Sequence, residues 1–231
     1  MDEARLKEDL VRACRVLGSN GQGDTVFGHA SARLPGWDRC WMKASGIGMD
    51  EVTLDDLVLI DLEGNVLKGE RTRHIEYPIH TEIFRARPDA TCVVHTHPMH
   101  SVAFAARGLE LRPVGHEGSF FWPPGVPTFT AFSDLVRTRE QGKSVASALG
   151  AGKALFLRNH GIAVADGSVT RATMSALMLE KAAAVQLLAQ PTNHGRFAHT
   201  PEDEADRKKA IWSDQAVQAM WEYYVRRLDQ P

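Results

Sequence analysis

A His-Thr-His triplet at residues 95–97 follows a run of mostly apolar residues at 90–94. Because successive side chains of a β-strand point to opposite faces, a strand here puts His95 and His97 on one face and Thr96 on the other. Neutral imidazole binds zinc and other late first-row divalent ions, and a catalytic metal site keeps about three protein ligands and an open position. The triplet therefore predicts two metal ligands, and two structural histidines are the alternative.

A third ligand has to come from elsewhere in the chain, and His160 is the candidate. It stands between Asn159 and Gly161 at the end of a predicted strand, where a tight turn can project a side chain into a cleft. Three imidazoles make zinc the first choice of metal. Manganese, cobalt or magnesium stay open, because a carboxylate would add a hard oxygen ligand.

Glu76 offers that carboxylate, just before a predicted helix. It can serve as a fourth ligand or as a proton carrier, and the alternative is a charge that only favours the N-terminus of the helix. His80 lies one helical turn after Glu76, so it either shares a face with Glu76 and orients the site or lies at the surface. We assign no role in the site to His100, His194 or His199.

These side chains need a framework of strands backed by helices, and the apolar spacing predicts one. Helices are predicted at residues 6–17, 77–87, 99–107, 133–149 with Ser133 as N-cap, 169–190 and 202–228. Strands are predicted between residues 28 and 67, with a hairpin of 58–62 and 66–67, and at 90–96, 154–157 and 162–165. Residues 113–127, rich in proline and glycine, are predicted to form an ordered loop near the site. This order of elements indicates an α/β layered fold with a largely antiparallel sheet.

The bulk properties fit one domain that binds a small molecule. The 231 residues are 43% hydrophobic, enough to bury the core of a single domain over residues 1–231. The net charge of -2 and the lack of a basic block argue against nucleic acid as a partner. A charged N-terminal segment and the lack of about 18 consecutive apolar residues argue against a signal peptide and a membrane span, so we expect a cytoplasmic protein. The three cysteines, odd in number and far apart, are interpreted as packed thiols.

Several of these segments together resemble the class II aldolase/adducin family. The resemblance is carried by residues 69–98, which hold Glu76 and the segment Val93-Val94-His95-Thr96-His97-Pro98, and by Leu157-Arg158-Asn159-His160-Gly161. Gly28-His29-Ala30-Ser31 looks like the family's Gly-Asn-x-Ser segment, and Lys43-Ala44-Ser45-Gly46 resembles its Thr-x-Ser-Gly turn. The likeness extends from about the first helix to the helix that follows residue 169.

The resemblance implies a three-layer α/β/α sandwich, commonly assembled as a homotetramer with sites at subunit interfaces. It also implies a divalent metal on three histidines, which match His95, His97 and His160. Glu76 falls on the family's acid/base carboxylate. Tyr224, beside Tyr223 on the last predicted helix, resembles in a loose alignment a family tyrosine that donates a proton, and ordinary helix packing is the alternative for it.

The segments that bind phosphate in the family's sugar-phosphate aldolases and epimerases differ in this chain. Those members use the Asn of the Gly-Asn segment and a serine pair just before the catalytic Glu, whereas this chain has His29 and His74-Ile75. Isoleucine offers phosphate no hydrogen bond, and imidazole is a poorer small donor than Asn or Ser, so we expect an unphosphorylated substrate. We expect His29 and His74 to contact that substrate together with Ser45 and Gly46.

Two arginines, Arg71 and Arg73, lie just upstream of His74. A guanidinium there can clamp a substrate carboxylate through two parallel hydrogen bonds. Two exposed charges on a loop are the alternative. A carboxylate clamp would suit a carboxylic acid as the small-molecule partner.

An aromatic cluster, Phe120, Phe121 and Trp122, follows His116. Such a wall suits a planar conjugated acid better than a hydroxylated sugar, and His116 would act with Glu76 in returning a proton to carbon. The pattern is similar to that of family members that decarboxylate aromatic acids or acids from ring cleavage, such as dihydroxyphthalate decarboxylases.

We therefore predict a metal-dependent carbon–carbon lyase. The first hypothesis is decarboxylation of an unphosphorylated aromatic or conjugated carboxylic acid, in which the electrons released by bond cleavage collect as an enolate that the metal stabilises. The second is a class II aldolase or epimerase that acts on a sugar or hydroxy-keto acid through the same enolate. The third is a non-catalytic, adducin-like interaction module, and the presence of all three metal histidines and Glu76 counts against it.

Overall fold

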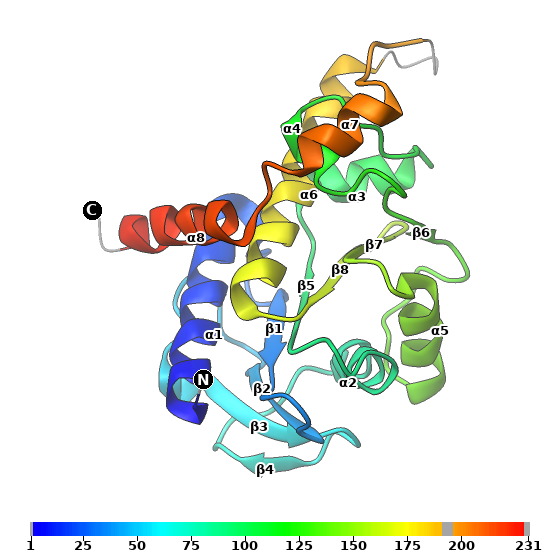
Figure 1. Ribbon diagram of the computed structural model, residues 1–231. Helices are drawn as coiled ribbons and strands as arrows, with labels where there is room; N and C mark the ends of the chain where they lie inside the picture. Colours follow the sequence, from blue (N-terminus) through cyan, green and yellow to red (C-terminus); the bar gives the residue numbers. More distant parts are fainter. Residues whose placement is uncertain (1, 191–195, 229–231) are drawn as a thin grey trace.

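An eight-stranded sheet forms the centre of the computed structural model, which describes residues 2–190 and 196–228 (Figure 1). The strands lie in the order β4-β3-β2-β1-β5-β8-β7-β6, and neighbours are antiparallel except for β6 with β7. Their bounds are β1 His29–Ala32, β2 Arg39–Lys43, β3 Leu57–Asp61, β4 Val66–Lys68, β5 Cys92–Thr96, β6 Thr128–Phe129, β7 Ala154–Leu157 and β8 Gly161–Asp166. The predicted hairpin is the pair β3 and β4.

Helices cover both faces of this sheet, as Figure 1 shows. They are α1 Glu3–Leu17, α2 Tyr77–Ala86, α3 Met99–Ala106, α4 His116–Ser119, α5 Arg139–Leu149, α6 Val169–Ala189, α7 Glu202–Lys209 and α8 Asp214–Leu228, with short turns η1 Gly18–Gln22 and η2 Leu54–Asp56. One apolar cluster joins α1, α3 and α6 to the sheet, and a second joins α2 and α5 to its other face. The predicted three-layer α/β/α sandwich with a largely antiparallel sheet is confirmed.

The alternation of side chains along β1 and β5 decides which face each residue serves. Ala30 of β1 and Val94 of β5 belong to the cluster beneath α1 and α6, while Val93 belongs to the cluster beneath α2 and α5. His29 pairs with His95 across the two strands, and both lie on the α2 side with Val93. The face that α2 covers therefore receives the histidines.

Two predicted helices differ from the observed ones, one because of a local cap and the other because of a tertiary contact. α5 starts at Arg139 rather than at residue 133, since Thr138 and Gln141 form a capping box there. The helix predicted at 202–228 is two helices. The chain breaks between them where Trp212 packs edge-on against Phe120, at 5.4 Å between ring centroids, and donates a hydrogen bond to Ser119.

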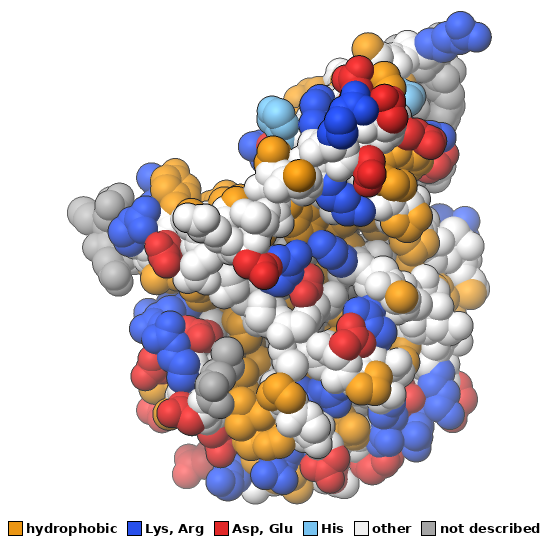
Figure 2. Space-filling view, viewed as in Figure 1, with side chains coloured by type: hydrophobic (Ala, Val, Ile, Leu, Met, Phe, Trp, Pro, Cys, Tyr) orange, Lys and Arg blue, Asp and Glu red, His pale blue; other side chains and the backbone are white. Residues whose placement is uncertain are grey.

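The surface and the core bear on two further expectations. Acidic and basic side chains are interspersed on the face that Figure 2 shows. The helix α6 is long and apolar enough to span a membrane by length and composition, which the sequence prediction overlooked. However, 61% of the 18-residue apolar window in this helix is buried inside the protein, as in the core helix of a globular protein. Cys14, Cys40 and Cys92 are buried free thiols, as predicted. A single domain over residues 1–231 stays a prediction.

Candidate metal centre and its cavity

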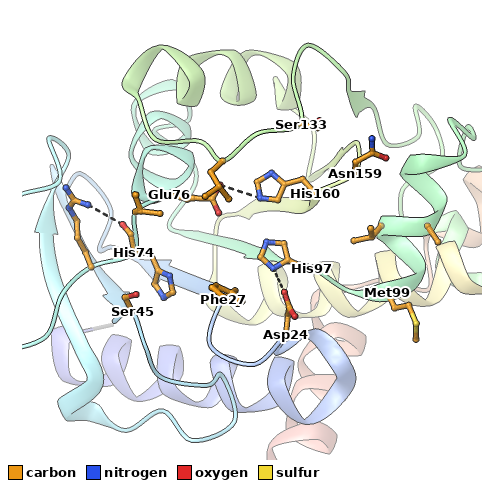
Figure 3. Close-up of a pocket in the computed structure, with 15 residues that line it drawn as sticks. Asp24, Phe27, Ser45, His74, Glu76, His97, Met99, Ser133, Asn159 and His160 are labelled. Carbon is orange, nitrogen blue, oxygen red and sulfur yellow. Dashed lines mark hydrogen bonds and ion pairs between the residues drawn. The ribbon is translucent and has the colours of Figure 1, made fainter.

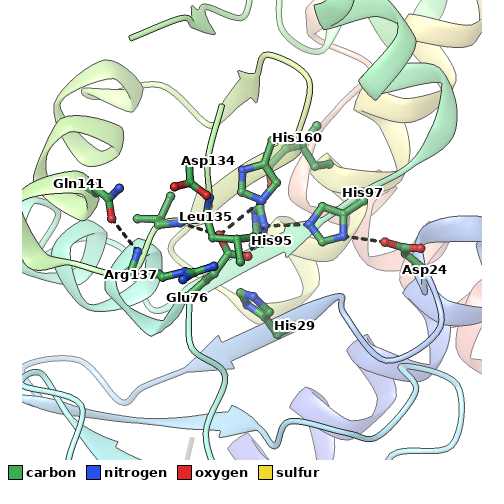
Figure 4. Close-up of polar contacts among 12 residues, drawn as sticks. Asp24, His29, Glu76, His95, His97, Asp134, Leu135, Arg137, Gln141 and His160 are labelled. Carbon is green, nitrogen blue, oxygen red and sulfur yellow. Dashed lines mark hydrogen bonds and ion pairs between the residues drawn. The ribbon is translucent and has the colours of Figure 1, made fainter. Parts of the chain in front are cut away.

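Four side chains from three parts of the chain converge at one end of the central strands. His95 lies in β5 one residue before its end, and His97 follows the strand. His160 lies in the turn between β7 and β8, and Glu76 stands directly before α2. Their ligand atoms all lie within 4.8 Å of one another. Figure 4 shows the three imidazoles and the carboxylate pointing toward one another. The structure thus brings together the metal ligands that the sequence predicts.

The turn that carries His160 has strict backbone requirements. Asn159 adopts a left-handed φ of 58°, which Asn tolerates better than most residues. A Cβ on Gly161 would lie 2.3 Å from the carbonyl oxygen of Thr96, so only glycine lets β8 approach β5 this closely. The Asn-His-Gly sequence is therefore what allows the imidazole to point back over the strand ends.

Hydrogen bonds turn the ligand nitrogens inward. His95 donates from Nδ1 to the carbonyl oxygen of Ile162 at 2.9 Å, and His97 from Nδ1 to the carboxylate of Asp24 at 3.0 Å. These partners leave the Nε2 atoms of His95 and His97 as acceptors, 3.1 Å apart. Two of the three predicted ligands are thus held as neutral imidazoles with a lone pair toward the centre.

The third imidazole gives a test of whether a metal fits. His160 Nε2 is buried and has no hydrogen-bond partner. Glu76 Oε1 lies 3.4 Å away but does not meet the geometry of a hydrogen bond. A buried polar atom without a partner costs free energy that a metal ion would recover. Three imidazole nitrogens and one carboxylate oxygen are a donor set that divalent metals accept, so the residues fit a bound ion.

Electrostatics keep His97 and Glu76 in the protonation states that a metal requires. Burial, together with the nearby His95 and His160, lowers the pKa of His97 to about 3. Burial alone would raise the pKa of Glu76, but contacts with His160 and His95 outweigh it and hold that pKa below its usual range. Glu76 also accepts a hydrogen bond from the backbone N–H of Val136 at 2.8 Å. It makes no capping hydrogen bond to α2, and a favourable charge at the N-terminus of that helix stays the alternative.

A cavity of about 890 Å³ opens over the centre, lined by His97, His160 and Glu76 among others (Figure 3). Its outer wall is apolar and open to solvent. Phe27 is 60% exposed and Met99 is 73% exposed, and Ile75 and Leu135 complete the apolar wall. Ser45 and Asn159 add polar groups to the lining. A few converging polar groups inside an apolar concavity are typical of a small-molecule site.

The comparisons with known proteins place this site in a family. The model of the Class II Aldolase and Adducin N-terminal domain matches residues 8–187. The chain belongs to the class II aldolase/adducin family. It is 30% identical to the 3,4-dihydroxyphthalate decarboxylase of Arthrobacter keyseri, over 99% of this chain and 96% of that one, and 33% identical to the enzyme of that name from Terrabacter sp., over 77% and 78%.

Solved structures of the class II aldolase family agree with the fold. The L-fuculose 1-phosphate aldolase from Glaciozyma antarctica superimposes with a TM-score of 0.85 at 28% identity, covering 98% of this chain and 89% of that one. An aldolase II superfamily protein from Pseudomonas syringae gives a TM-score of 0.87 at 26% identity, over 99% and 93%. The relatives include both decarboxylases and aldolases, so the comparisons show the enzyme superfamily and leave the reaction to the site itself.

Some of the residues predicted to bind substrate in this chain line the cavity, and others do not. His74, Ser45 and Arg73 line it. His29 lies directly behind His74, with 4.3 Å between ring centroids. Gly46, with a φ of 80°, follows Ser45 and is not among the lining residues.

The predicted arginine clamp for a substrate carboxylate stays a prediction, because each arginine already has contacts within the protein. Arg71 makes an ion pair with Asp56 at 2.7 Å and lies outside the cavity. Arg73 donates to the carbonyl oxygens of Gly64 and His74 and stacks over the ring of Tyr77 at 3.8 Å. Both guanidinium groups therefore use part of their donors on the protein itself, and only Arg73 lines the cavity.

The prediction that an aromatic segment forms a wall of the site is wrong for the single chain. Phe120 and Phe121 are buried in the cluster beneath α6, and Trp122 is buried as well. His116 lies on α4, which packs against α6 and α7. Tyr224 of α8 lies beside His100 and Glu180 at a separate hollow. A catalytic role for His116 or Tyr224 would need a second copy of the chain to bring them to the cavity, and it stays a prediction.

The remaining histidines divide into one buried group and several peripheral ones. His80 is fully buried and bonds to His29, so its alternative as a surface residue is wrong. His100 bonds to Glu180 and His199 is exposed, as expected for residues without a site role. His194 lies outside the described residues.

One candidate site residue escaped the sequence prediction. Asp24, the partner of His97, lines the cavity and has a left-handed φ of 38°, followed by Thr25 at 53°. Two consecutive residues other than glycine in this conformation are strained, and such strain gathers at functional sites. Its contact with His97 spans 73 positions, and the local sequence carried no signal for it.

Proposed function

We propose that this chain is a metal-dependent lyase that decarboxylates an unphosphorylated aromatic or conjugated carboxylic acid. The observation that carries the proposal is the cavity wall beside the metal centre. That wall consists of His74 and Ile75 with His29 behind it, and the nearby Arg71 and Arg73 are engaged by protein groups. A phosphate dianion would find few free donors there, whereas a carboxylate needs only one or two.

The apolar outer wall favours a flat, conjugated substrate over a sugar. Phe27 and Met99 lie on one part of the rim, and Ile75 and Leu135 complete it. A hydroxylated sugar would leave its hydroxyl groups against these side chains without hydrogen bonds, at a cost of about 1–3 kcal/mol for each buried group. An aromatic ring would instead bury apolar surface against them.

The metal would be held by His95, His97 and His160, with Glu76 beside it either as a fourth ligand or only as the acid and base. When bound, a divalent ion supplies positive charge that polarises a neighbouring substrate oxygen and stabilises the electrons released by carbon–carbon cleavage. Zinc is the proposed ion because of the three imidazoles, with manganese, cobalt or magnesium as alternatives.

The side chains at the cavity have separate roles in this proposal. Ser45 and His74 hold the substrate carboxyl group by hydrogen bonds at the inner wall. Cleavage breaks the bond between the carboxyl carbon and the ring, carbon dioxide leaves, and the electron pair stays on the ring system. Glu76 accepts a proton from a substrate hydroxyl and returns a proton to the carbon that lost its carboxyl group, which is the work of a positioned general acid and base.

The relatives named 3,4-dihydroxyphthalate decarboxylase support this choice, since one aligns over nearly the whole of both chains. The structural likeness to an L-fuculose 1-phosphate aldolase keeps a second candidate, an aldolase or epimerase that acts on a sugar or hydroxy-keto acid. Both reactions use the same centre. They differ in whether the cavity wall binds a phosphate, and His74 with Ile75 favours the decarboxylase.

We also propose a homo-oligomer, a tetramer by family resemblance, with a neighbouring copy covering the apolar rim of the cavity. The exposed side chains of Phe27 and Met99 support it, because an apolar rim of this kind is usually covered by another surface. Residence in the cytoplasm and a place in the breakdown of aromatic compounds stay predictions.

The test measures carbon dioxide from the metal-reconstituted protein with dihydroxybenzoic, dihydroxyphthalic and ring-cleavage acids, and aldehyde from sugar phosphates in parallel. We expect carbon dioxide from an aromatic or dienoic acid, and a loss of about 10²-fold or more in kcat for Glu76→Gln. Glu140→Gln, at an exposed carboxylate of α5, is the matched control. Aldehyde from a sugar phosphate without carbon dioxide would establish the aldolase, and a purified protein that binds no metal would favour the non-catalytic module.

A further inference from the structure

A chain of three buried side chains runs from the sheet to the metal centre. His29 and Ser31 lie on the same face of β1, two residues apart, and His80 of α2 lies against both. His29 Nδ1 and His80 Nε2 are 2.7 Å apart, and His80 Nδ1 and Ser31 Oγ are 2.6 Å apart. All three are at most 1% exposed. Each of these short contacts needs one proton, so the protons along the chain must all point the same way.

The far end of the chain sets that direction. The Ser31 hydroxyl is fully buried, and its polar neighbours among the described residues are His80 Nδ1, at 2.6 Å, and the buried thiol of Cys40. An imidazole nitrogen is a much better acceptor than a thiol sulfur. The Ser31 hydroxyl therefore donates to His80 Nδ1. The opposite direction would leave the hydroxyl only the sulfur as its acceptor.

The direction of the Ser31–His80 hydrogen bond fixes the position of the proton on both imidazoles. Because His80 Nδ1 accepts, its proton is on Nε2 and is donated to His29 Nδ1. His29 then carries its own proton on Nε2. That nitrogen has no hydrogen-bond partner among residues 2–190 and 196–228, and it is not a fully enclosed atom.

The ring of His29 lies where a free donor can act on a substrate. Its centroid is 4.3 Å from that of His74, which lines the cavity, and 4.9 Å from that of His95. Figure 4 shows His29 beside the metal centre, next to His95 and Glu76. His29 therefore lies behind His74 of the cavity wall and beside the metal centre, so a carboxyl group that reaches the inner end of the cavity would meet its ring.

We propose that Ser31 and His80 are positioning residues that fix the proton of His29 on Nε2, so that His29 donates a hydrogen bond to the carboxylate of the substrate. The substrate class in this statement rests on the proposed function. With the opposite tautomer, His29 would present a lone pair to the same carboxylate and repel it. The three residues thus select an anionic oxygen at this point of the cavity.

The tautomers can be measured without any substrate. Long-range proton–nitrogen NMR of the zinc-loaded protein, labelled with ¹⁵N-histidine, separates protonated from unprotonated ring nitrogens, and His29→Gln and His80→Gln assign the signals. We expect the proton on Nε2 in both His29 and His80. A proton on Nδ1 of His29 overturns the proposal, whatever reaction the enzyme performs.

The functional consequence is tested at Ser31. Ser31→Ala removes the donor to His80, so we expect the His29 tautomer to shift and the KM for the acid substrate to rise about 10- to 100-fold, while metal affinity stays unchanged. Ser31→Thr keeps a hydroxyl and should restore both. Ser175→Ala is the control, because Ser175 is equally buried but its hydroxyl has no partner. An unchanged tautomer and KM in Ser31→Ala would overturn the positioning role. If the protein releases carbon dioxide from no acid, the proposed function fails, but the NMR result still decides the tautomer of His29.

Discussion

The two faces of the central sheet differ in chemistry although the same strands supply both. The face beneath α1, α3 and α6 carries mainly apolar side chains such as Ala30 and Val94. The face beneath α2 holds the buried polar groups, including His29 and His95, which neighbour those residues in sequence. Strand alternation therefore separates stability from function at a spacing of one residue. Changes on the first face should affect the free energy of unfolding, and changes on the second should affect metal and substrate.

Lys43 is the exception to this division. It follows Met42 at the end of β2, is fully buried, and lies near Cys14 of α1 on the apolar side. Its ammonium group has three acceptors, the carbonyl oxygens of Val26 and Ala44 and the imidazole of His74, at 3.2–3.3 Å. Lys43 thus bonds across the edge of the sheet from one face to the other.

The largest expected effect comes from removing a metal ligand on the polar face. We expect His160→Ala to lose stoichiometric metal, measured by elemental analysis of the purified protein, and to lose activity with it. Thr96→Val is the matched control, because Thr96 lies between His95 and His97 but points to the apolar face, where it bonds to Gln22. It should keep its metal and lose only about 1 kcal/mol of stability. Full metal content in His160→Ala would remove His160 from the ligand set.

The converse change is made in the apolar face. Leu10 of α1 is fully buried, and Leu10→Ala should lower the free energy of unfolding by about 2–5 kcal/mol through lost burial and a residual cavity. Denaturant titration measures this change, and a metal titration of the folded variant should match that of the wild type. A large loss of metal affinity would show that the two faces are coupled rather than separate.

The sequence predicts well which histidines come together, because the position of each depends on local geometry. The period of two in a strand fixes His95 and His97, and the Asn-His-Gly turn fixes His160. The sequence predicts poorly those features that depend on residues far away in the chain. Whether Phe120 faces a cavity or the core depends on α6 and on Trp212, and the break between α7 and α8 depends on the same contact. An apolar residue carries the same sequence signal in both places.

Lys43, the buried charge on the otherwise apolar face, can be tested through the pH dependence of stability. Burial lowers its pKa from 10.5 to about 8, against the opposing effects of Cys14, Glu51 and Asp56, so the folded protein binds its proton less tightly than the unfolded chain. Stability should therefore rise between pH 8 and 10.5, by at most about 3 kcal/mol. The difference in unfolding free energy between wild type and Lys43→Met, measured across this range, isolates the effect. A constant difference would mean that Lys43 keeps an ordinary pKa.

The smallest effect is expected at Asp24, where strain and function can be separated. Asp24→Gly removes the carboxylate and suits the left-handed φ, while Thr25→Gly relieves the neighbouring strain and keeps the carboxylate. Losing a partner that orients a ligand histidine typically weakens metal binding about 10- to 100-fold, and the half-exposed side chain of Asp24 places the expectation near tenfold. Competition with a chelator measures it. Thr25→Gly should bind metal like the wild type, and equal affinity in both variants would mean that Asp24 only shapes the loop beside the polar face.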